Sequence, residues 1–165
     1  MNGAVSRQTQ GAGTYDITLP GVECRNGGPS TDYIIVFNFS NVVTSVDQVT
    51  TSCGSINSSA VDGTDGHNFI VHVNGAGCNA QNVTITLTGI HDDMGSTLAS
   101  AAATVGLLIG DTTGDGSVNS ADIGQTKSQS GQAVTGSNFR TDVNQDGTVN
   151  SADITLVKSR SGTGL

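Results

Sequence analysis

The feature that most constrains this chain is a repeat near its C-terminus. Two 13-residue segments begin 31 residues apart and are identical at nine positions: Asp111 to Ile123 (DTTGDGSVNSADI) and Asp142 to Ile154 (DVNQDGTVNSADI). A repeated unit of this size cannot bury its apolar residues alone, so we expect the copies to pack together. The fold must therefore accommodate two equivalent loops, each followed by the same short segment.

Each loop carries oxygen-bearing side chains at positions one, three, five and twelve and a glycine at position six, which is the EF-hand spacing. Calcium takes six to eight oxygens at about 2.4 Å, so the backbone must curl around the ion, and glycine permits the bend. Position seven supplies a backbone carbonyl. The spacing predicts two Ca²⁺ sites with ten candidate ligating residues: Asp111, Thr113, Asp115, Ser117 and Asp122, then Asp142, Asn144, Asp146, Thr148 and Asp153.

The residues around position twelve predict how each loop joins its helix. Val118 and Val149, at position eight, are expected to turn into a core. Ser120 and Ser151 are expected helix starts. Position twelve is Asp where sensor EF-hands usually have Glu, so the helix must begin closer to the ion. The first helix is poor in apolar residues and should depend on the ion and on its sister unit.

The charge of the chain agrees with cation binding. The formal net charge is -8, from 14 acidic residues against six Lys and Arg, and six of the carboxylates lie in the two loops. Packed carboxylates repel, and two divalent cations would offset about half of the net charge. The same balance makes nucleic acid or an anionic membrane surface improbable partners.

Residues 110–162 resemble a type I dockerin, a family with two loop-helix repeats that lack the incoming helix of a full EF-hand. The resemblance implies calcium-dependent docking to a cohesin partner through either helix. The corresponding recognition positions are Ser120, Ala121, Lys127 and Ser128, or Ser151, Ala152, Lys158 and Ser159. Two departures are the Ser-Ala pairs, in place of Ser-Thr, and Thr113, in place of the usual Asn. Thr113 keeps an oxygen but predicts a weaker first site.

The linker at residues 131–141 contains Phe139, one of four phenylalanines. We expect this ring to pack between the two repeats; the alternative is an exposed linker aromatic.

The N-terminal part has the period-two pattern and the Gly, Asn and Asp turns of β structure. The clearest strand is Asn82 to Gly89, where Val83, Ile85 and Leu87 share a core face and threonines alternate with them. These patterns predict an immunoglobulin-like β-sandwich over residues 1–109, followed without a flexible tether by a small α calcium module over residues 110–165. The other expected strands are Tyr33 to Phe39, Thr14 to Leu19, Val42 to Thr51, Asn68 to Val73 and Thr104 to Ile109.

No motif in the β part predicts catalysis. The chain has no GxSxG elbow, no cysteine nucleophile signature and no singled-out carboxylate pair. His72 is expected in a strand and His91 in a turn after a strand, and no spacing brings three zinc ligands together. We therefore expect a non-enzyme, with surface or edge histidines and a solvated acidic turn. The other side chains of this part that could serve in catalysis or metal binding are His67, Asp92 and Asp93.

The three cysteines fit neither a zinc site nor a CxxC motif, but two of them could pair outside the cell. We expect Cys53 to bond Cys78, because each lies beside a strand-like run, which leaves Cys24 free. Asn-x-Ser/Thr triplets at Asn38, Asn57 and Asn82 are possible glycan acceptors on a secreted protein.

The sequence thus predicts a secreted calcium-binding scaffold or attachment module, with a cohesin-like protein or copies of itself as partner. No segment is apolar for the ~18 residues that a membrane span requires. The N-terminus lacks signal-peptide order, so we expect a removed signal or a longer chain. Alternatives are a self-assembling fibre or surface-layer subunit that shares a strand such as Thr14 to Leu19, and a carbohydrate-binding sandwich, which the absence of Trp disfavours.

Overall fold

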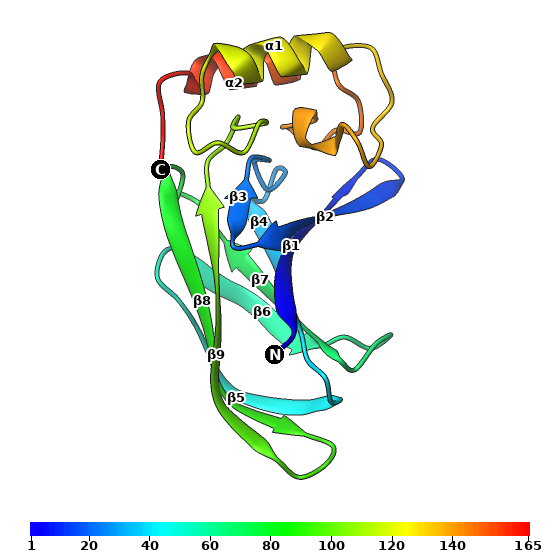
Figure 1. The fold of residues 1–165 in the computed structure, drawn as a ribbon, viewed down its shortest axis with the longest axis vertical. Coiled ribbons are helices and arrows are strands. Elements are labelled where there is room, and N and C mark those ends of the chain that lie inside the picture. Colours follow the sequence, from blue (N-terminus) through cyan, green and yellow to red (C-terminus); the bar gives the residue numbers. More distant parts are fainter.

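The computed structural model describes residues 1–165 as two β-sheets with two helices at one end (Figure 1). One sheet has the strand order β2-β1-β4-β7-β6 and the other β3-β9-β8-β5. The strands are β1 (Gly3–Gln10), β2 (Gly13–Leu19), β3 (Gly21–Glu23), β4 (Asp32–Asn38), β5 (Val43–Thr51), β6 (Ser55–Val61), β7 (Asn68–Asn74), β8 (Gln81–Asp92) and β9 (Thr97–Leu107). A mostly β, two-sheet fold therefore precedes the helices.

The period-two pattern places the core between the sheets. Val83, Ile85 and Leu87 of β8 are fully buried, and the threonines between them are partly exposed, as the alternation predicted. Apolar side chains from both sheets form one cluster of 19 buried residues, which includes Phe37 of the central strand β4. Burial of this apolar surface is the main force that holds the two sheets together.

Three strands, β1, β3 and β6, were not predicted from the sequence. β1 carries Ser6, Gln8 and Gln10 on its buried side, so it lacks the apolar alternation of a half-buried strand. β3 has only three residues, and β6 is mostly exposed and rich in serine. Periodicity finds apolar faces, and strands with polar inner faces or very short strands give no such signal.

Two expected boundaries were wrong. β8 continues beyond Gly89 to Asp92, so His91 lies within a strand and not in a turn after one. β9 begins at Thr97, well before the expected Thr104, because its first half consists of small Ala and Ser residues that carry little pattern. Pairing with the neighbouring strand, and not local apolar periodicity, extends both elements.

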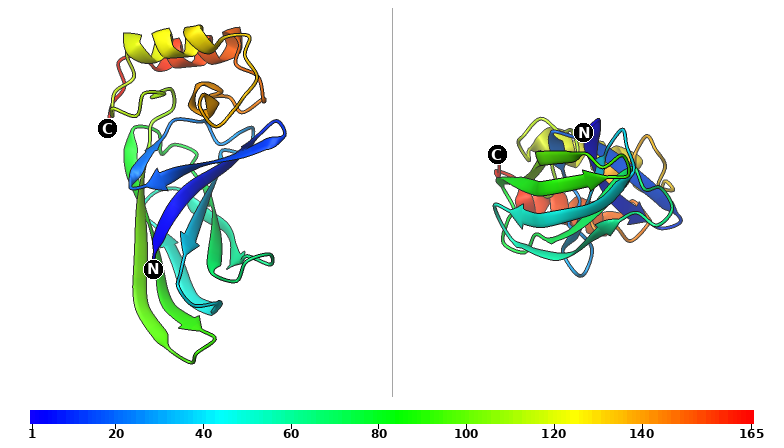
Figure 2. Two further views of the ribbon diagram at one scale, coloured as in Figure 1. Left: turned by 45° about the vertical axis from the view of Figure 1, so that its right-hand side comes forward. Right: turned by 90° about the horizontal axis from the view of Figure 1, so that it is seen from below.

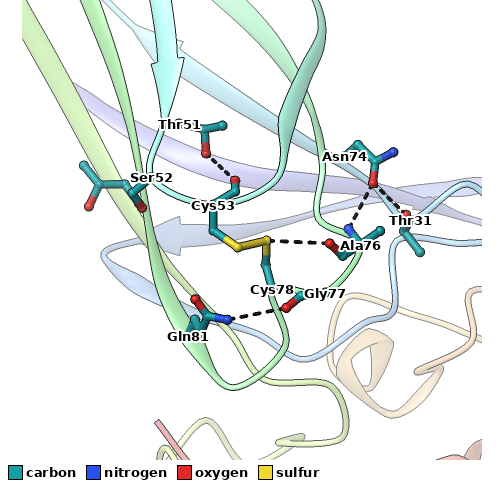
Figure 3. Close-up of a disulfide and its surroundings, with 10 residues drawn as sticks. Thr31, Thr51, Ser52, Cys53, Asn74, Ala76, Gly77, Cys78 and Gln81 are labelled. Atoms are coloured by element: carbon teal, nitrogen blue, oxygen red, sulfur yellow. Dashed lines mark hydrogen bonds between the residues drawn. A yellow bond between two sulfur atoms is a disulfide. The ribbon is translucent and has the colours of Figure 1, made fainter.

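A disulfide joins Cys53, after β5, to Cys78, before β8, as expected (Figure 3). Cys78 is fully buried, and Thr51 Oγ1 donates a hydrogen bond to the Cys53 carbonyl oxygen at 2.7 Å. Cys24 is free and buried. The bond ties the connection that leads from one sheet to the other to the turn that follows β7.

The C-terminal residues form α1 (Ser120–Gln129), the short 3₁₀ helix η1 (Phe139–Thr141) and α2 (Ser151–Arg160). Both long helices begin at the expected serines, but Asn119 and Asn150 are the N-caps, each accepting from a backbone N–H of the first turn. The helices lie side by side at the end of the molecule farthest from the sheets (Figure 2). Neither is long and apolar enough to cross a membrane.

A small second core lies beneath the helices. It consists of Leu108, Val118, Val143 and Val157, with Val149 also buried. Val118 and Val149 are the position-eight residues of the two loops, so the structure confirms that both turn inward. Four core residues are few, so the region gains further order from its contacts with the sheets.

Candidate metal centre and its contacts with the sheets

The two loops share one backbone conformation. In each, one carboxylate oxygen of position one accepts from the N–H of position six, from Gly116 to Asp111 at 2.8 Å and from Gly147 to Asp142 at 3.0 Å. Both glycines have positive φ values, +87° and +89°, which side chains rarely adopt. The bend expected at position six is therefore present in both copies.

Position twelve closes each loop against the start of its helix. Asp122 accepts from the N–H of the N-cap Asn119 at 2.8 Å, and Asp153 accepts from that of Asn150 at 2.9 Å. The second oxygen of each carboxylate accepts from the N–H of position three. Both carboxylates are fully buried, so the short Asp does draw the helix start against the loop.

The loops differ at position one. In the first loop, Asp111 Oδ1 accepts from the N–H groups of Gly114 and Asp115, at 2.8 and 3.2 Å. In the second loop, Asp142 Oδ1 is buried and has no hydrogen-bond partner. Burial, together with the nearby carboxylate of Asp153, raises the pKa of Asp142 to about 6. An unpaired buried carboxylate oxygen is costly, and a bound cation would satisfy it.

The pKa of Asp153 is also raised, chiefly by burial. A pair of carboxylates whose buried, charged form is disfavoured fits a divalent cation, which compensates both charges. The unpaired oxygen of Asp142 and the raised pKa values of Asp142 and Asp153 therefore make the second loop fit Ca²⁺.

The remaining candidate ligands lie at the rim of the loops. Asp115 and Asp146 are exposed, and each accepts from the N–H of position seven, at 2.9 Å in both loops. The Thr113 hydroxyl donates to Asp122 at 2.9 Å. No group of three or more His, Cys, Asp or Glu side chains is arranged to hold a metal ion. The structure thus brings positions one and twelve inside each loop, and internal hydrogen bonds occupy positions three and five.

The three histidines have three different partners, and none of these partners belongs to the loops. His67, His72 and His91 each contact a different aspartate, Asp65, Asp32 and Asp47 respectively.

The linker between the repeats packs against the β region. The Phe139 ring stacks on Tyr15 of β2, with centroids 5.3 Å apart and planes 6° from parallel, and the Arg25 guanidinium lies 5.2 Å from its centroid. The expectation placed Phe139 between the two repeats; its ring partners instead belong to the β region. The Tyr15 hydroxyl also donates to the Val134 carbonyl oxygen at 3.1 Å.

A buried ion pair supports this contact. Arg25 and Glu23 are both fully buried and form two charge-assisted hydrogen bonds of 2.7 Å. Arg25 also donates to Gln10 Oε1 at 3.2 Å and to the Tyr15 carbonyl oxygen at 3.1 Å. Opposite charge and full pairing make such burial tolerable, and they fix the side chains that face the linker.

Sequence reasoning missed Gln10, Tyr15, Glu23 and Arg25. Gln10 and Glu23 lie in strands that gave no period-two signal, and no local pattern indicates that Gln10 meets a segment more than 100 positions later. An Arg and a Glu two residues apart in a chain with few charges were the only available indication.

The expected recognition positions lie on the free side of the helices. Ser120, Ala121, Lys127 and Ser128 of α1 are all exposed, and so are Ser151, Ala152, Lys158 and Ser159 of α2. The β region contacts the loops and linker, which lie on the opposite side (Figure 1). Both helices therefore stay accessible while the repeats are docked on the sheets.

Residues 109–160 match the family model for the dockerin type I domain. The matched segment is less than half of the chain and contains both loops and both helices. No curated protein and no solved structure matches the chain. The chain therefore consists of a β-rich region followed by a dockerin-like segment.

Proposed function

We propose that this protein is an extracellular, non-catalytic assembly module in which two calcium ions order the repeats and the helices bind a protein partner. The observation that carries the proposal is the exposure of both helices on the face away from the sheets, with the corresponding positions of both repeats presented together. Completing the β fold does not require two helices whose equivalent positions are both exposed.

Calcium binding is supported by the duplicated bends at Gly116 and Gly147 and by the unpaired buried oxygen of Asp142. In the absence of a cation, buried like charges destabilise the loops, and the four-residue core is too small to compensate. We propose all ten loop residues predicted from the sequence as the ligand set of two Ca²⁺ sites. The second site is the stronger, because Asp111 already has protein donors and Asp142 Oδ1 has none.

The proposed partner is a cohesin-type protein, by analogy with the family that matches residues 109–160. The proposed division is an immunoglobulin-like sandwich over residues 1–109 and the dockerin-like module over residues 110–165. The disulfide supports an oxidising, extracellular location. Asn82 is exposed and is the better glycan acceptor, because the Asn38 amide donates to Asn68 and the Asn57 amide donates to Asp32.

Self-assembly through a sheet edge is the second candidate. β2, which contains the expected sharing segment Thr14 to Leu19, is indeed an edge strand. Its Tyr15 is covered by the linker, which leaves only the far half of the edge for a second copy. Carbohydrate binding has less support, because Tyr33 is buried and Tyr15 is stacked on Phe139, so neither tyrosine is free to stack on a sugar.

The test combines calorimetry and light scattering on the full chain after chelation. Titration with CaCl₂ should show two binding events, and the calcium-loaded protein should remain monomeric and bind at least one member of a panel of type I cohesins. The double variant Lys127→Glu/Lys158→Glu should weaken that binding, whereas Arg7→Glu, a control on the sheet, should not. Absence of calcium binding rejects the proposal, and particles that grow with calcium favour self-assembly.

A further inference from the structure

The bend of the second loop, but not that of the first, is in direct contact with the β region. A Cβ atom placed on Gly147 would meet the Cα and N atoms of Gly11, in the turn between β1 and β2, at 2.8 and 2.9 Å. A Cβ atom on Gly116, the equivalent residue of the first loop, would meet nothing within 4 Å. Two loops of nearly the same sequence thus have different surroundings.

Gln10 connects the β1–β2 turn to the start of the second loop. Its side chain is almost fully buried, and its Nε2 donates to the carbonyl oxygens of Asp142, at 2.7 Å, and Phe139, at 2.8 Å. Its Oε1 accepts from Arg25. The amide is therefore held from behind by a buried ion pair, and both of its donor hydrogens fix the backbone that leads into position one.

Other groups of the β region hold the same stretch. The N–H of Asn26 donates to the Val143 carbonyl oxygen at 2.9 Å, and the Cys24 thiol donates to the Arg140 carbonyl oxygen at 3.4 Å. Together with Gln10, these contacts fix four of the five residues from 139 to 143 against the sheets.

Position one of the first loop is held differently. The carbonyl oxygen of Asp111 accepts from Arg140, a linker residue, at 3.0 Å, and not from a sheet residue. The residue before it, Gly110, donates its N–H to the Cys24 carbonyl oxygen. The bend and rim of the first loop, from Thr113 to Ser117, are thus free of the β1–β2 turn.

We propose that the second loop is the calcium site that fastens the repeats to the β region, and that Gln10 is its positioning residue. This inference rests on the calcium binding proposed above. By fixing the Phe139 and Asp142 carbonyls, Gln10 sets the direction in which the Asp142 carboxylate enters the loop. Linkage makes the effect reciprocal: if Gln10 favours calcium binding, then calcium strengthens the contact of the β1–β2 turn with the loop by the same free energy.

The first experiment measures calcium affinity on the full chain with Gln10→Ala. Loss of an outer-shell partner typically weakens metal binding roughly 10- to 100-fold, so one of the two sites should weaken by roughly 10-fold or more and the other should keep its affinity. Gln8→Ala is the matched control. Gln8 lies two residues earlier on β1 and is similarly buried, but it donates to the Asp32 carbonyl oxygen within the β region. Its removal should change neither calcium affinity.

The second experiment follows amide hydrogen exchange at residues 8–15 with and without calcium, in Asp122→Ala and in Asp153→Ala. Calcium should slow exchange in the wild type and in Asp122→Ala, and should fail to do so in Asp153→Ala. This comparison stands even if Gln10→Ala does not fold.

Equal responses of the two aspartate variants, or unchanged affinities in a folded Gln10→Ala, overturn the inference while calcium binding itself stands. A wild type that binds no calcium overturns the proposed function as well.

Discussion

The Cys53–Cys78 bond should make a large, measurable contribution to the stability of the β region. The cysteines are 25 residues apart in sequence. In the chain-entropy description, closing a loop of that length in the unfolded state stabilises the fold by about 3.5 kcal/mol at 25 °C. For a chain of this size, that free energy corresponds to a decrease in Tm of about 7–14 °C when the bond is absent.

The perturbation is the double variant Cys53→Ala/Cys78→Ala, compared with the wild type under saturating calcium. Because the chain contains no Trp, urea unfolding is best followed by far-ultraviolet circular dichroism. The substitutions also remove buried sulfur, since Cys78 is fully buried. Wild-type protein reduced with dithiothreitol keeps both side chains, so its loss of stability isolates the cross-link from the cavity.

Neither cysteine is hydrogen-bonded to a calcium-loop residue, so calcium affinity should be the same in the variant and the wild type. A reduced wild type that loses less than about 1 kcal/mol would refute the loop-closure reasoning. A change in calcium affinity would show that the bond acts on the loops through Asn79, the residue after Cys78, whose side chain accepts from the N–H of Ile109 at 2.8 Å.

Three further predictions test the repeats and their contact with the sheets. Gly147→Ala and Gly116→Ala both place a side chain at a positive φ, but only the alanine at 147 also meets the β1–β2 turn. The decrease in Tm should therefore be larger for Gly147→Ala, and equal decreases would contradict the contact between the second loop and that turn. Cys24 should resist iodoacetamide at pH 8 until the chain unfolds, because burial raises the pKa of its thiol to about 12; rapid labelling of native protein, read by mass spectrometry, would show otherwise. Phe139→Ala should lower the free energy of unfolding, measured in urea, by about 2 kcal/mol through loss of ring packing. Tyr15→Phe should lower it by about 1 kcal/mol through loss of one hydrogen bond. An unchanged stability of Phe139→Ala would mean that the stacked pair contributes nothing.

The docked repeats define what a partner can reach. The β region covers residues 139–143 and one side of the second loop, and the helix positions that either repeat could present remain exposed. A partner that binds one helix therefore does not have to displace the β region. If the proposed partner binds these helices, two equivalent faces on a fixed support would let it bind in either of two orientations related by the internal repeat.

Local sequence determined the elements that depend on short-range chemistry. The repeat predicted both bends, both buried valines and both helix starts, because the loop spacing fixes the glycine at position six, the valine at position eight and the residue that begins the helix. Alternation predicted β8 and most of β2, β4, β5 and β7, because these strands bury one apolar face. The cysteine pairing was also predictable, since each cysteine lies beside a strand.

Only the tertiary structure decided how the two parts meet. The loops at Asp111 and Asp142 are equivalent in sequence, yet the second alone lies against the β1–β2 turn and has an unpaired buried oxygen. Gln10 donates to backbone carbonyls, and Arg25 lies over an aromatic ring, in a segment more than 100 residues away. Local patterns report which side chains a segment buries, but a contact between distant polar residues depends on the packing of the whole chain, and that packing is what makes two similar loops different.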